Sequence, residues 1–512
     1  MERKVAIVGA GIAGLIACKY FLSKGYKPIV FESKSRLGGV WCKTIETTKL
    51  QTVKQFYEFM DFPWPESEET YPNHEEVLAY IESYAQHFDL IRHIAFDTEV
   101  VSIDYQGVDE EEIMAWGMWG GTGEVFSNKG KWNLKVENTR TRSSEVHQVD
   151  FVILALGLVR DVPYVPEFPT GKGPEVFQGD TIHAQDYADM DYDKARNFIR
   201  GKRVAVVGFG KFAVDITAEC AAVNGKDRPC TLLFRRKHWF MPETKNWRNL
   251  LGYLYTSRFA ELLADRPGRG CLHTLLATTL SPLRWLFSFL SESYLKWKFP
   301  YKKYGLVPKY HLSEAVTTCK VNIVPEGFFD RVDDGSIKLQ KAEEFSFCKE
   351  GILVKREPEP VEVDLVIFAT GYRGERKVQD IFVSKTFRNL LTGPDSKIAP
   401  LYRQCIHPRI PQLAIVGLAG SFSMLFSSEM MCKWVVELLD GTFKLPSVPE
   451  MEKCTKEWSE YTKRHGGKTC LPAIHIWYSD QLFKDMGLNP RRKNGFLAEL
   501  FEPYSPSDYK LS

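Results

Sequence analysis

The sequence predicts an α/β protein in which one nucleotide-type unit is inserted into another. Two observations support this fold class. An apolar strand, a glycine-rich turn, a helix and a second strand follow one another over residues 4–33, and the same order begins again at residue 202. Two further apolar segments, 151–154 and 365–368, each end in a turn of small residues. We therefore expect two doubly wound, Rossmann-like domains that bind dinucleotides.

The first unit contains a GxGxxG turn between the strand at 5–8 and the helix that follows. In this pattern the first glycine allows a tight turn, the second lets the backbone approach a pyrophosphate, and the third lets the helix pack on the strand. The helix N-terminus offers unpaired N–H groups to the phosphates. The cofactor-binding candidates are Gly9, Ala10, Gly11, Ile12, Ala13 and Gly14.

A carboxylate closes the second strand of this unit. Glu32 stands 18 residues after Gly14, at the position where an acid accepts hydrogen bonds from ribose hydroxyls. A carboxylate there accepts a free diol and repels a 2′-phosphate. The first unit should therefore bind a dinucleotide whose ribose is not phosphorylated.

The second unit differs at this position. Its strand at 231–234 is followed by Arg235 and Arg236, whose guanidinium groups can pair with a 2′-phosphate, which favours NADP over NAD. A solvated strand end is the alternative interpretation of the two arginines. Ala213 replaces the third glycine, which the motif allows. The binding candidates are Gly208, Phe209, Gly210, Lys211, Phe212, Ala213, Arg235 and Arg236.

The connectors predict the domain boundaries. A proline-rich segment, 163–174, follows the first small-residue turn, and two prolines within 357–362 precede the second. We expect the first domain to comprise residues 1–168 and 350–512, and the second to comprise residues 169–349. An aromatic, helical stretch at about 247–310 should be an insertion within the second domain.

Composition excludes several classes of protein. The 67 Lys and Arg residues nearly balance 65 Asp and Glu residues, and the net charge of +2 speaks against a nucleic-acid binder. The eleven cysteines are scattered, odd in number and without a CxxC pair, which indicates buried thiols in a reducing compartment rather than a disulfide framework or a metal site.

The chain shows no targeting or spanning segment in its pattern. The apolar run at 5–8 is too short for the core of a signal peptide, so we expect an intracellular protein, in the cytoplasm or at the cytosolic face of the endoplasmic reticulum. Residues 275–290 are apolar but interrupted by Pro282 and Arg284, which predicts a core or lid helix, or contact with a membrane surface, rather than a span.

Three further segments carry a family resemblance. Residues 177–187 match the signature FxGxxxHxxxY, residues 369–372 read Ala-Thr-Gly-Tyr, and residues 36–41 resemble a second diphosphate segment. Together with the two glycine turns, these segments resemble the flavin-containing monooxygenases over essentially the whole chain. The phrases at 46–51 and 61–65 resemble plant members, including those that hydroxylate a cyclic amino acid on nitrogen.

The resemblance implies FAD in the first domain and NADPH in the second. NADPH would reduce FAD, O₂ would add to the reduced flavin at C4a, and the resulting hydroperoxide would oxygenate a nucleophilic nitrogen or sulfur of a small molecule. Nitrogen is favoured, no metal is needed, and the partners are the substrate and O₂. Further FAD-binding candidates are Gly39, Val40, Trp41 and Val100.

One position departs from the family pattern. Animal and bacterial members usually carry an asparagine ten residues before the Asp-Phe-Pro segment, and this chain has Gln51 there. Glutamine keeps the amide donor and acceptor but reaches one methylene further. Gln51 is the catalytic candidate, with a packing role as the alternative.

Other enzymes and one other class of protein remain as alternatives. A disulfide reductase needs two neighbouring redox cysteines, which the spacing does not provide. A Baeyer–Villiger enzyme has a related signature that ends in tryptophan, whereas this one ends in Tyr187. An indole-pyruvate-type monooxygenase and a non-catalytic flavoprotein sensor or scaffold are the remaining alternatives.

Overall fold

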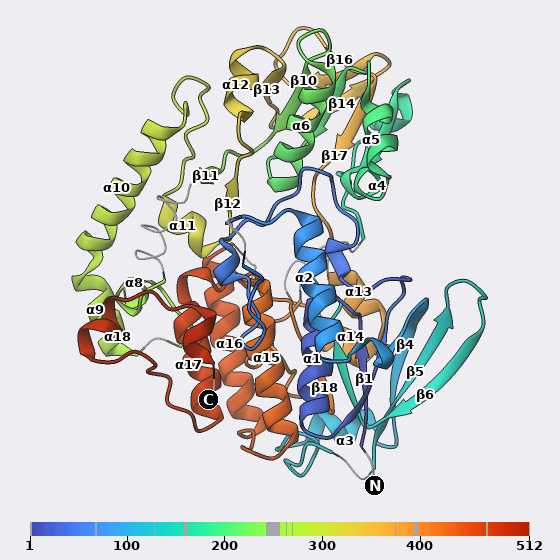
Figure 1. Ribbon diagram of the computed structural model, residues 1–512, viewed down its shortest axis with the longest axis vertical. Helices are drawn as coiled ribbons and strands as arrows, with labels where there is room; N and C mark the ends of the chain where they lie inside the picture. The colour runs from blue at the N-terminus through green and yellow to red at the C-terminus, as the bar shows by residue number, and fades with distance from the viewer. Residues whose placement is uncertain are drawn as a thin grey trace.

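The computed structural model describes residues 3–66, 69–126, 129–157, 162–241, 256–262, 264–268, 270–373, 375–393, 398–466 and 469–510. Figure 1 shows two α/β parts, one above the other, with an antiparallel sheet at the right and a group of helices at the lower left. The predicted fold class is confirmed, because each part is built on a parallel sheet of five strands.

The lower part contains the first parallel sheet. Its strand order is β18 (Leu413–Ile415), β7 (Phe151–Leu154), β1 (Lys4–Val8), β2 (Lys27–Phe31) and β3 (Ile94–Ala95). Helices α1 (Ile12–Ser23) and α15 (Met424–Leu439) pack against each other beside this sheet. The antiparallel strands β4 (Thr98–Gln106), β5 (Lys131–Asn138) and β6 (Ser144–Val149) form a separate sheet. Covered on both faces, β7 and β18 are buried along their whole length, which is typical of parallel strands.

The upper part contains the second parallel sheet. Its order is β13 (Ile337–Lys341), β10 (Cys230–Phe234), β9 (Val204–Val207), β17 (Leu365–Phe368) and β8 (Asp180–His183), with α6 (Lys211–Asn224) following β9. Strands β14 (Phe345–Cys348), β15 (Gly351–Val354) and β16 (Val361–Glu362) form a small antiparallel sheet.

The expected boundary at residue 350 is wrong. Strand β17 pairs in parallel with β9 and with β8, so residues to at least 368 belong to the second domain. The apolar side chains of β15 and β17 also share one buried cluster with those of β9. The small-residue turn after β17 marks the return of the chain to the first domain. The sequence pattern shows that 365–368 is a buried strand, but it does not show to which of the two sheets the strand belongs.

The two connections between the domains lie side by side. The backbone N–H of Tyr164 donates to the carbonyl of Gly371 (2.9 Å), and that of Arg373 donates to Val162 (2.9 Å). Pro163 and Tyr372 form an isolated antiparallel bridge between these bonds. The chain therefore leaves and re-enters the first domain through one paired ribbon.

The insertion forms the outer edge of the molecule. Helices α8 (Arg258–Leu262), α9 (Cys271–Thr279) and α10 (Ser281–Lys298) lie between β11 (Trp239–Met241) and its partner β12 (Val321–Ile323). Residues 247–255 of the expected insertion lie outside the described residues. Figure 1 shows α10 along the left edge, with α9 at its lower end. None of the helices in the described ranges is long and apolar enough to cross a membrane.

Eleven further helices complete the fold. They are α2 (His74–His87), α3 (Glu110–Ala115), α4 (Ala184–Ala188), α5 (Tyr192–Ile199), α11 (Leu312–Thr317), α12 (Phe328–Asp333), α13 (Glu375–Asp380), α14 (Lys385–Leu391), α16 (Val448–Arg464), α17 (His475–Asp485) and α18 (Phe496–Phe501) in the part of the chain that the structure describes.

The expectation that the cysteines are unpaired thiols is wrong for two of them. Cys319 and Cys470 form a disulfide across 151 residues of sequence. Cys319 follows α11 in the second domain and Cys470 precedes α17 in the first. Because tertiary contacts alone bring these distant residues together, spacing along the sequence does not reveal the pair.

Candidate active site

The first glycine turn has the tight packing that its spacing predicts. Gly9 has a φ of +105°, and a Cβ on it would lie 2.6 Å from the carbonyl oxygen of Ala155. A Cβ on Gly14 would lie 1.8 Å from the carbonyl oxygen of Gly9, so only glycine lets α1 approach β1 this closely. Helix α1 begins after Gly11 without a side-chain cap, which leaves its first N–H groups for a ligand.

The structure brings the second predicted diphosphate segment onto this turn. Gly39 has a φ of +61°, and a Cβ on it would lie 3.2 Å from the Cα of Gly11. The N–H of Gly38 donates to the carbonyl of Ala10 (3.0 Å). Gly39 and Val40 begin a single 3₁₀ turn that ends at Trp41. Two glycines thus face each other with bare backbone, and this cradle fits a diphosphate.

Glu32, which directly follows β2, also stabilises the glycine turn through hydrogen bonds. Its buried carboxylate accepts hydrogen bonds from the N–H of Ala10 (2.8 Å) and of Lys34 (2.9 Å). A carboxylate has about four acceptor positions, so these bonds leave capacity for a ribose diol. Val100 lies in β4, close to this strand end, and its side chain is buried in an apolar cluster with Phe31.

Two aromatic candidates already have protein partners. The indole Nε1 of Trp41 donates to the hydroxyl of Tyr57 (2.8 Å), and the two rings meet edge to face. In the second domain Phe209 is buried and stacks on Phe234, with 4.4 Å between the ring centroids. Packing therefore accounts for the position of both rings.

The second glycine turn repeats the geometry of the first. Gly208 has a φ of +143°, and a Cβ on it would lie 2.3 Å from the carbonyl oxygen of Ala369 and 3.3 Å from the Cβ of Ala213. Gly210 precedes α6, and the space beside it is open. The Nζ of Lys211 lies 2.6 Å from the Oδ1 of Asp215, one turn along the helix, and Phe212 is partly buried.

A basic group surrounds the end of β10. Arg235 and Arg236 are exposed directly after the strand. Burial, together with the charges of Lys320 and Arg236, lowers the pKa of His238 to about 4. Lys320 carries no local signal in the sequence, because it lies 84 residues after Arg236 and is brought near by the pairing of β11 with β12. These cations fit a phosphate group.

Residues of the signature at 177–187 contact the segment that connects the two domains. His183 caps α4, where its Nδ1 accepts from the N–H of Gln185, and its Nε2 lies 3.1 Å from the carbonyl of Gly371 in the connecting ribbon. Tyr187 donates to the carboxylate of Glu219 on α6 (3.1 Å). Burial raises the pKa of Glu219 to about 7.

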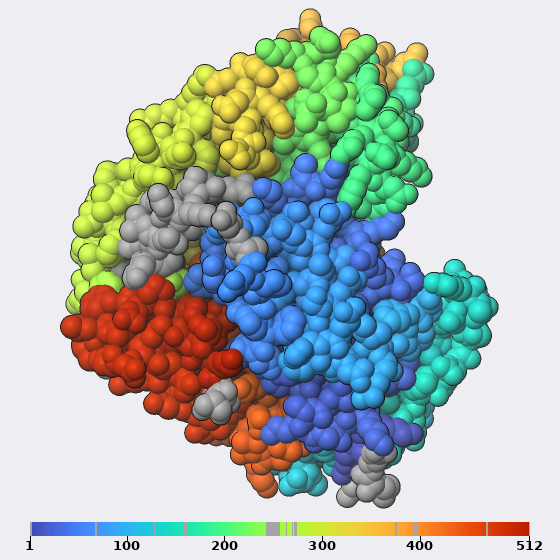
Figure 2. Space-filling view, viewed as in Figure 1, coloured from blue at the N-terminus to red at the C-terminus, as the bar shows by residue number. Residues whose placement is uncertain are grey.

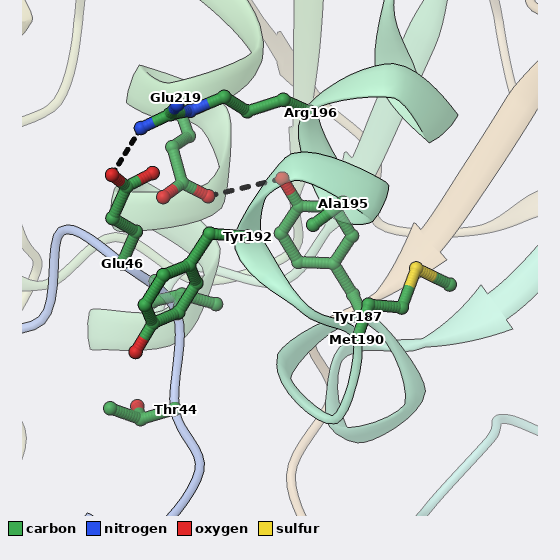
Figure 3. A pocket seen from close by; sticks show the side chains of 9 residues that line it. Thr44, Glu46, Tyr187, Met190, Tyr192, Ala195, Arg196 and Glu219 are labelled. Atoms are coloured by element: carbon green, nitrogen blue, oxygen red, sulfur yellow. Dashed lines mark hydrogen bonds and ion pairs between the residues drawn. The ribbon is translucent and has the colours of Figure 1, made fainter.

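Figure 3 shows where Tyr187 and Glu219 lie close to residues of the first domain. Around a small cavity, the ion pair of Glu46 with Arg196 lies close to the Tyr187–Glu219 bond, and Tyr192 faces Thr44. Glu46 comes from the segment after the second diphosphate cradle, whereas Arg196 lies on α5. The contact therefore joins the two predicted cofactor domains.

Gln51 lies at a bend three residues before the 3₁₀ turn Lys54–Phe56, and its side chain is exposed. Phe56 at the end of this turn lines a second hollow, together with the segment that follows β18 and the C-terminal segment. The residues that line the hollow are Phe56, Ser421, Phe422, Ser423, Phe426, His475, Tyr504, Ser505, Pro506 and Tyr509.

Two polar atoms at this hollow are buried without a hydrogen-bond partner, the Nε2 of His475 and the hydroxyl of Tyr509. Burial lowers the pKa of His475 to about 4 and raises that of Tyr509 well above its ordinary value, so both are neutral at pH 7. Neither residue lies in a sequence motif, so the sequence pattern does not reveal them.

Residues 2–499 match the flavin-binding monooxygenase-like family. Probable flavin-containing monooxygenase 1 of Arabidopsis thaliana is 39% identical over 523 residues, which cover 100% of this chain and 96% of the relative. Flavin-containing monooxygenase 1 of Oryctolagus cuniculus is 27% identical and is matched over 100% of this chain and 90% of its own length.

Solved structures share the fold. A steroid monooxygenase bound to NADP superposes with a TM-score of 0.65 at 19% identity, covering 95% of this chain and 98% of that one. S-allyl-L-cysteine S-oxygenase from Allium sativum superposes with a TM-score of 0.59 at 18% identity, covering 96% and 89%. At these identities the likeness concerns the fold alone.

Proposed function

The chain belongs to the flavin-binding monooxygenase-like family, and from this premise we propose that it hydroxylates the nitrogen of a small amine that carries an N–H bond. It is an NADPH-dependent flavin monooxygenase that uses FAD and O₂. When bound, the two cofactors supply the reducing equivalents and activate oxygen. The protein must hold the cofactors, orient the substrate and exclude water.

The glycine turns would hold the cofactors. The bare backbone of Gly11 and Gly39 and the carboxylate of Glu32 fit the diphosphate and free ribose of FAD. The start of α6 and the arginines after β10 fit the phosphates of NADPH. Gln51 remains the catalytic candidate, because its segment leads directly into the wall of the hollow.

The hollow lined by Phe56 and His475 would hold the substrate. Its walls are aromatic rings, serine hydroxyls and a neutral imidazole, so no side chain in the lining carries a charge at pH 7. A low-polarity wall disfavours an ammonium ion and favours the free amine. The free amine is also the nucleophilic form, since only it has a lone pair to accept oxygen.

The unpartnered Nε2 of His475 carries the preference for nitrogen. Its Nδ1 lies 3.2 Å from the carbonyl of Pro472, an acceptor, so Nδ1 holds the proton and Nε2 presents a lone pair. A primary or secondary amine can donate its N–H to that lone pair. A thioether has no such donor and would leave Nε2 unsatisfied, at a cost of about 1–3 kcal/mol.

Paired substrates test this proposal. Piperidine and tetrahydrothiopyran have the same ring size and differ in the heteroatom, so the holoenzyme with NADPH and air should add one oxygen to the amine at least about tenfold more efficiently. Mass spectrometry detects the gain of one oxygen. Equal turnover, or preference for the thioether, would refute the assignment to nitrogen.

The His475→Leu variant tests the residue itself. Loss of the acceptor should raise KM for the amine about tenfold, and it should not impair oxygenation of the thioether, because no unpaired acceptor remains. A general defect in folding would lower both activities in parallel, and flavin content measured by absorbance separates that case. Ser505→Ala provides the matched control in the same lining.

A further inference from the structure

A buried carboxyl group of the insertion lies at the N-terminus of α17. Glu261 on α8 is 7% exposed, and its two carboxyl oxygens accept hydrogen bonds from the N–H groups of Ile476 (2.7 Å) and Trp477 (2.7 Å). The N-cap residue of α17 provides no side-chain cap, so Glu261 satisfies N–H groups that the helix leaves unpaired. Because both oxygens accept, the contact fits the ionised carboxylate rather than the protonated acid, in which one oxygen is a donor.

The same carboxyl group lies beside the imidazole that lines the hollow. The Oε1 of Glu261 lies 3.3 Å from the Nδ1 of His475. The carbonyl oxygen of Pro472 lies 3.2 Å from the same nitrogen, so the Nδ1 proton has two acceptors near it. On the other side of the ring, Nε2 is buried without a hydrogen-bond partner in the part of the chain that the structure describes. A carboxylate behind an imidazole that has a free lone pair in front is the arrangement of a general base.

Ion pairs hold Glu261 in this place. Arg258, three residues earlier on α8, pairs with Asp480 on α17 and with Glu499 on α18. Helix α8 packs against both of these helices. Figure 2 shows the C-terminal part of the chain, in red, directly below the insertion, in yellow-green, at the left edge of the molecule. The insertion therefore places a carboxyl group next to the hollow of the other domain.

Burial determines how basic this pair is. It raises the pKa of Glu261 to about 8 and lowers the pKa of His475 to about 4. The buried imidazole alone does not hold a proton near neutral pH, whereas a carboxylate with a raised pKa is a base strong enough to hold one. The other charged or titratable groups that interact with Glu261 are Arg258, Arg266, Asp480, Tyr461 and Tyr509.

We infer that His475 and Glu261 together accept the N–H proton of the amine while its nitrogen is hydroxylated, a role that rests on the proposed function. The lone pair of the amine nitrogen forms the N–O bond as the O–O bond of the activated oxygen breaks, so nitrogen loses two electrons to oxygen. The N–H proton passes to Nε2 of His475, and the pair then releases it to the second oxygen atom, which leaves as water. His475 is the catalytic residue, and Glu261 is a positioning residue that acts through it.

Secondary and tertiary amines distinguish this role from a structural one. Piperidine loses an N–H proton when its nitrogen is hydroxylated, whereas N-methylpiperidine forms an N-oxide without losing one. With the holoenzyme, NADPH and air, Glu261→Gln should lower kcat for piperidine at least about tenfold and leave kcat for N-methylpiperidine nearly unchanged. Mass spectrometry of both oxygenated products measures the two rates.

A pH profile gives a second readout. The pair accepts a proton only when Glu261 is ionised, so kcat of the wild type for piperidine should rise as pH increases through about 8. At saturating amine, kcat reports groups of the enzyme–substrate complex and not the ionisation of the free amine. The rise should be absent with N-methylpiperidine and absent in Glu261→Gln.

A second variant keeps the test decisive if Glu261→Gln does not fold. His475→Gln retains an amide acceptor for the amine but takes up no proton, so kcat for piperidine should fall while kcat for N-methylpiperidine is maintained. Flavin content and melting temperature show whether each variant is folded. Glu460→Gln, an exposed change on α16, is the matched control and should behave like the wild type.

The outcomes separate the proton-accepting pair from the proposed function. A wild type that prefers tetrahydrothiopyran to piperidine would refute the proposed function. A wild type that prefers piperidine, with folded Glu261→Gln and His475→Gln variants that slow both amines equally or neither, would refute the pair alone. Selective loss of piperidine hydroxylation in the folded variants, together with loss of the rise through pH 8, would establish it.

Discussion

Gly11 and Gly14 belong to one motif but should respond differently to a methyl group. A Cβ on Gly14 would lie 1.8 Å from backbone, whereas a Cβ on Gly11 would meet only the Cα of Gly39 at 3.7 Å, an ordinary contact. Gly14 is therefore needed for folding, and Gly11 is needed for the approach of a ligand. Sequence spacing assigns both roles, and the atoms around each position explain them.

Substitution with alanine should separate the two roles. Gly11→Ala should keep a near-native melting temperature and lose FAD affinity about tenfold or more, because the methyl group occupies the diphosphate cradle. Gly14→Ala should fail to fold stably. Fluorescence titration of the apoprotein with FAD measures the affinity, and Gly117→Ala, at a position with open space, is the control. Unchanged FAD affinity of Gly11→Ala would refute the cradle.

Arg235 should determine the choice of nicotinamide cofactor. Arg235→Ala should raise KM for NADPH about tenfold and leave KM for NADH nearly unchanged, since a charged hydrogen bond to the 2′-phosphate contributes about 1.5–3 kcal/mol. Steady-state flavin reduction with both cofactors measures this ratio. Arg200→Ala changes another exposed arginine of the same domain and should shift neither value. Equal effects on both cofactors would contradict the assignment.

At the scale of elements, α15 is held to α1 by a buried carboxyl group. Glu429 accepts hydrogen bonds from the hydroxyl of Tyr20 (3.0 Å) and the N–H of Met60 (2.9 Å). Burial, together with the charge of the neighbouring Asp61, raises the pKa of Glu429 to about 7. The native state therefore takes up a proton that the unfolded chain releases at lower pH.

The raised pKa of Glu429 predicts a pH dependence of stability. Between pH 4.5 and 7 the native protein binds more protons than the unfolded chain, so its free energy of unfolding falls as pH rises. Glu429→Gln should remove up to about 3 kcal/mol of this fall. Melting temperatures at pH 5 and pH 8 measure it, with the exposed Glu111→Gln as control. The same slope in Glu429→Gln as in wild type would exclude this carboxyl as its source.

At the scale of the whole molecule, several contacts join the domains in the described residues, and three of them differ in kind. One is the paired ribbon at Pro163 and Tyr372, and another is the ion pair of Glu46 with Arg196 in Figure 3. The disulfide between Cys319 and Cys470 is the covalent one. Since the ribbon alone would leave the domains free to turn, contacts such as the ion pair and the disulfide limit that motion.

Reduction of the disulfide should lower stability. Closing a loop of 151 residues restricts the unfolded chain, and opening it should cost about 2–4 kcal/mol. Dithiothreitol should lower the melting temperature of the wild type and of Cys348→Ser, an unpaired cysteine. Cys319→Ser should melt at the lower temperature with or without reductant. A wild type insensitive to dithiothreitol would show that the bond does not contribute.

The sequence by itself determined the fold class, the family and both glycine turns. These features depend on local periodicity and on spacing within 30 residues, which a strand–turn–helix unit records directly. The positions of Glu32 and Arg235 at strand ends follow from the same local pattern, and the structure places both there.

Only the tertiary structure decided which sheet receives β17, which cysteines pair, and which residues line the hollow. Lys320, Glu429, His475 and Tyr509 reach their sites from segments far away in the sequence. The sequence also left open whether the apolar side of α10 faces outward, because an amphipathic pattern shows that a helix has two sides and not which side the protein covers. Long-range packing makes that choice.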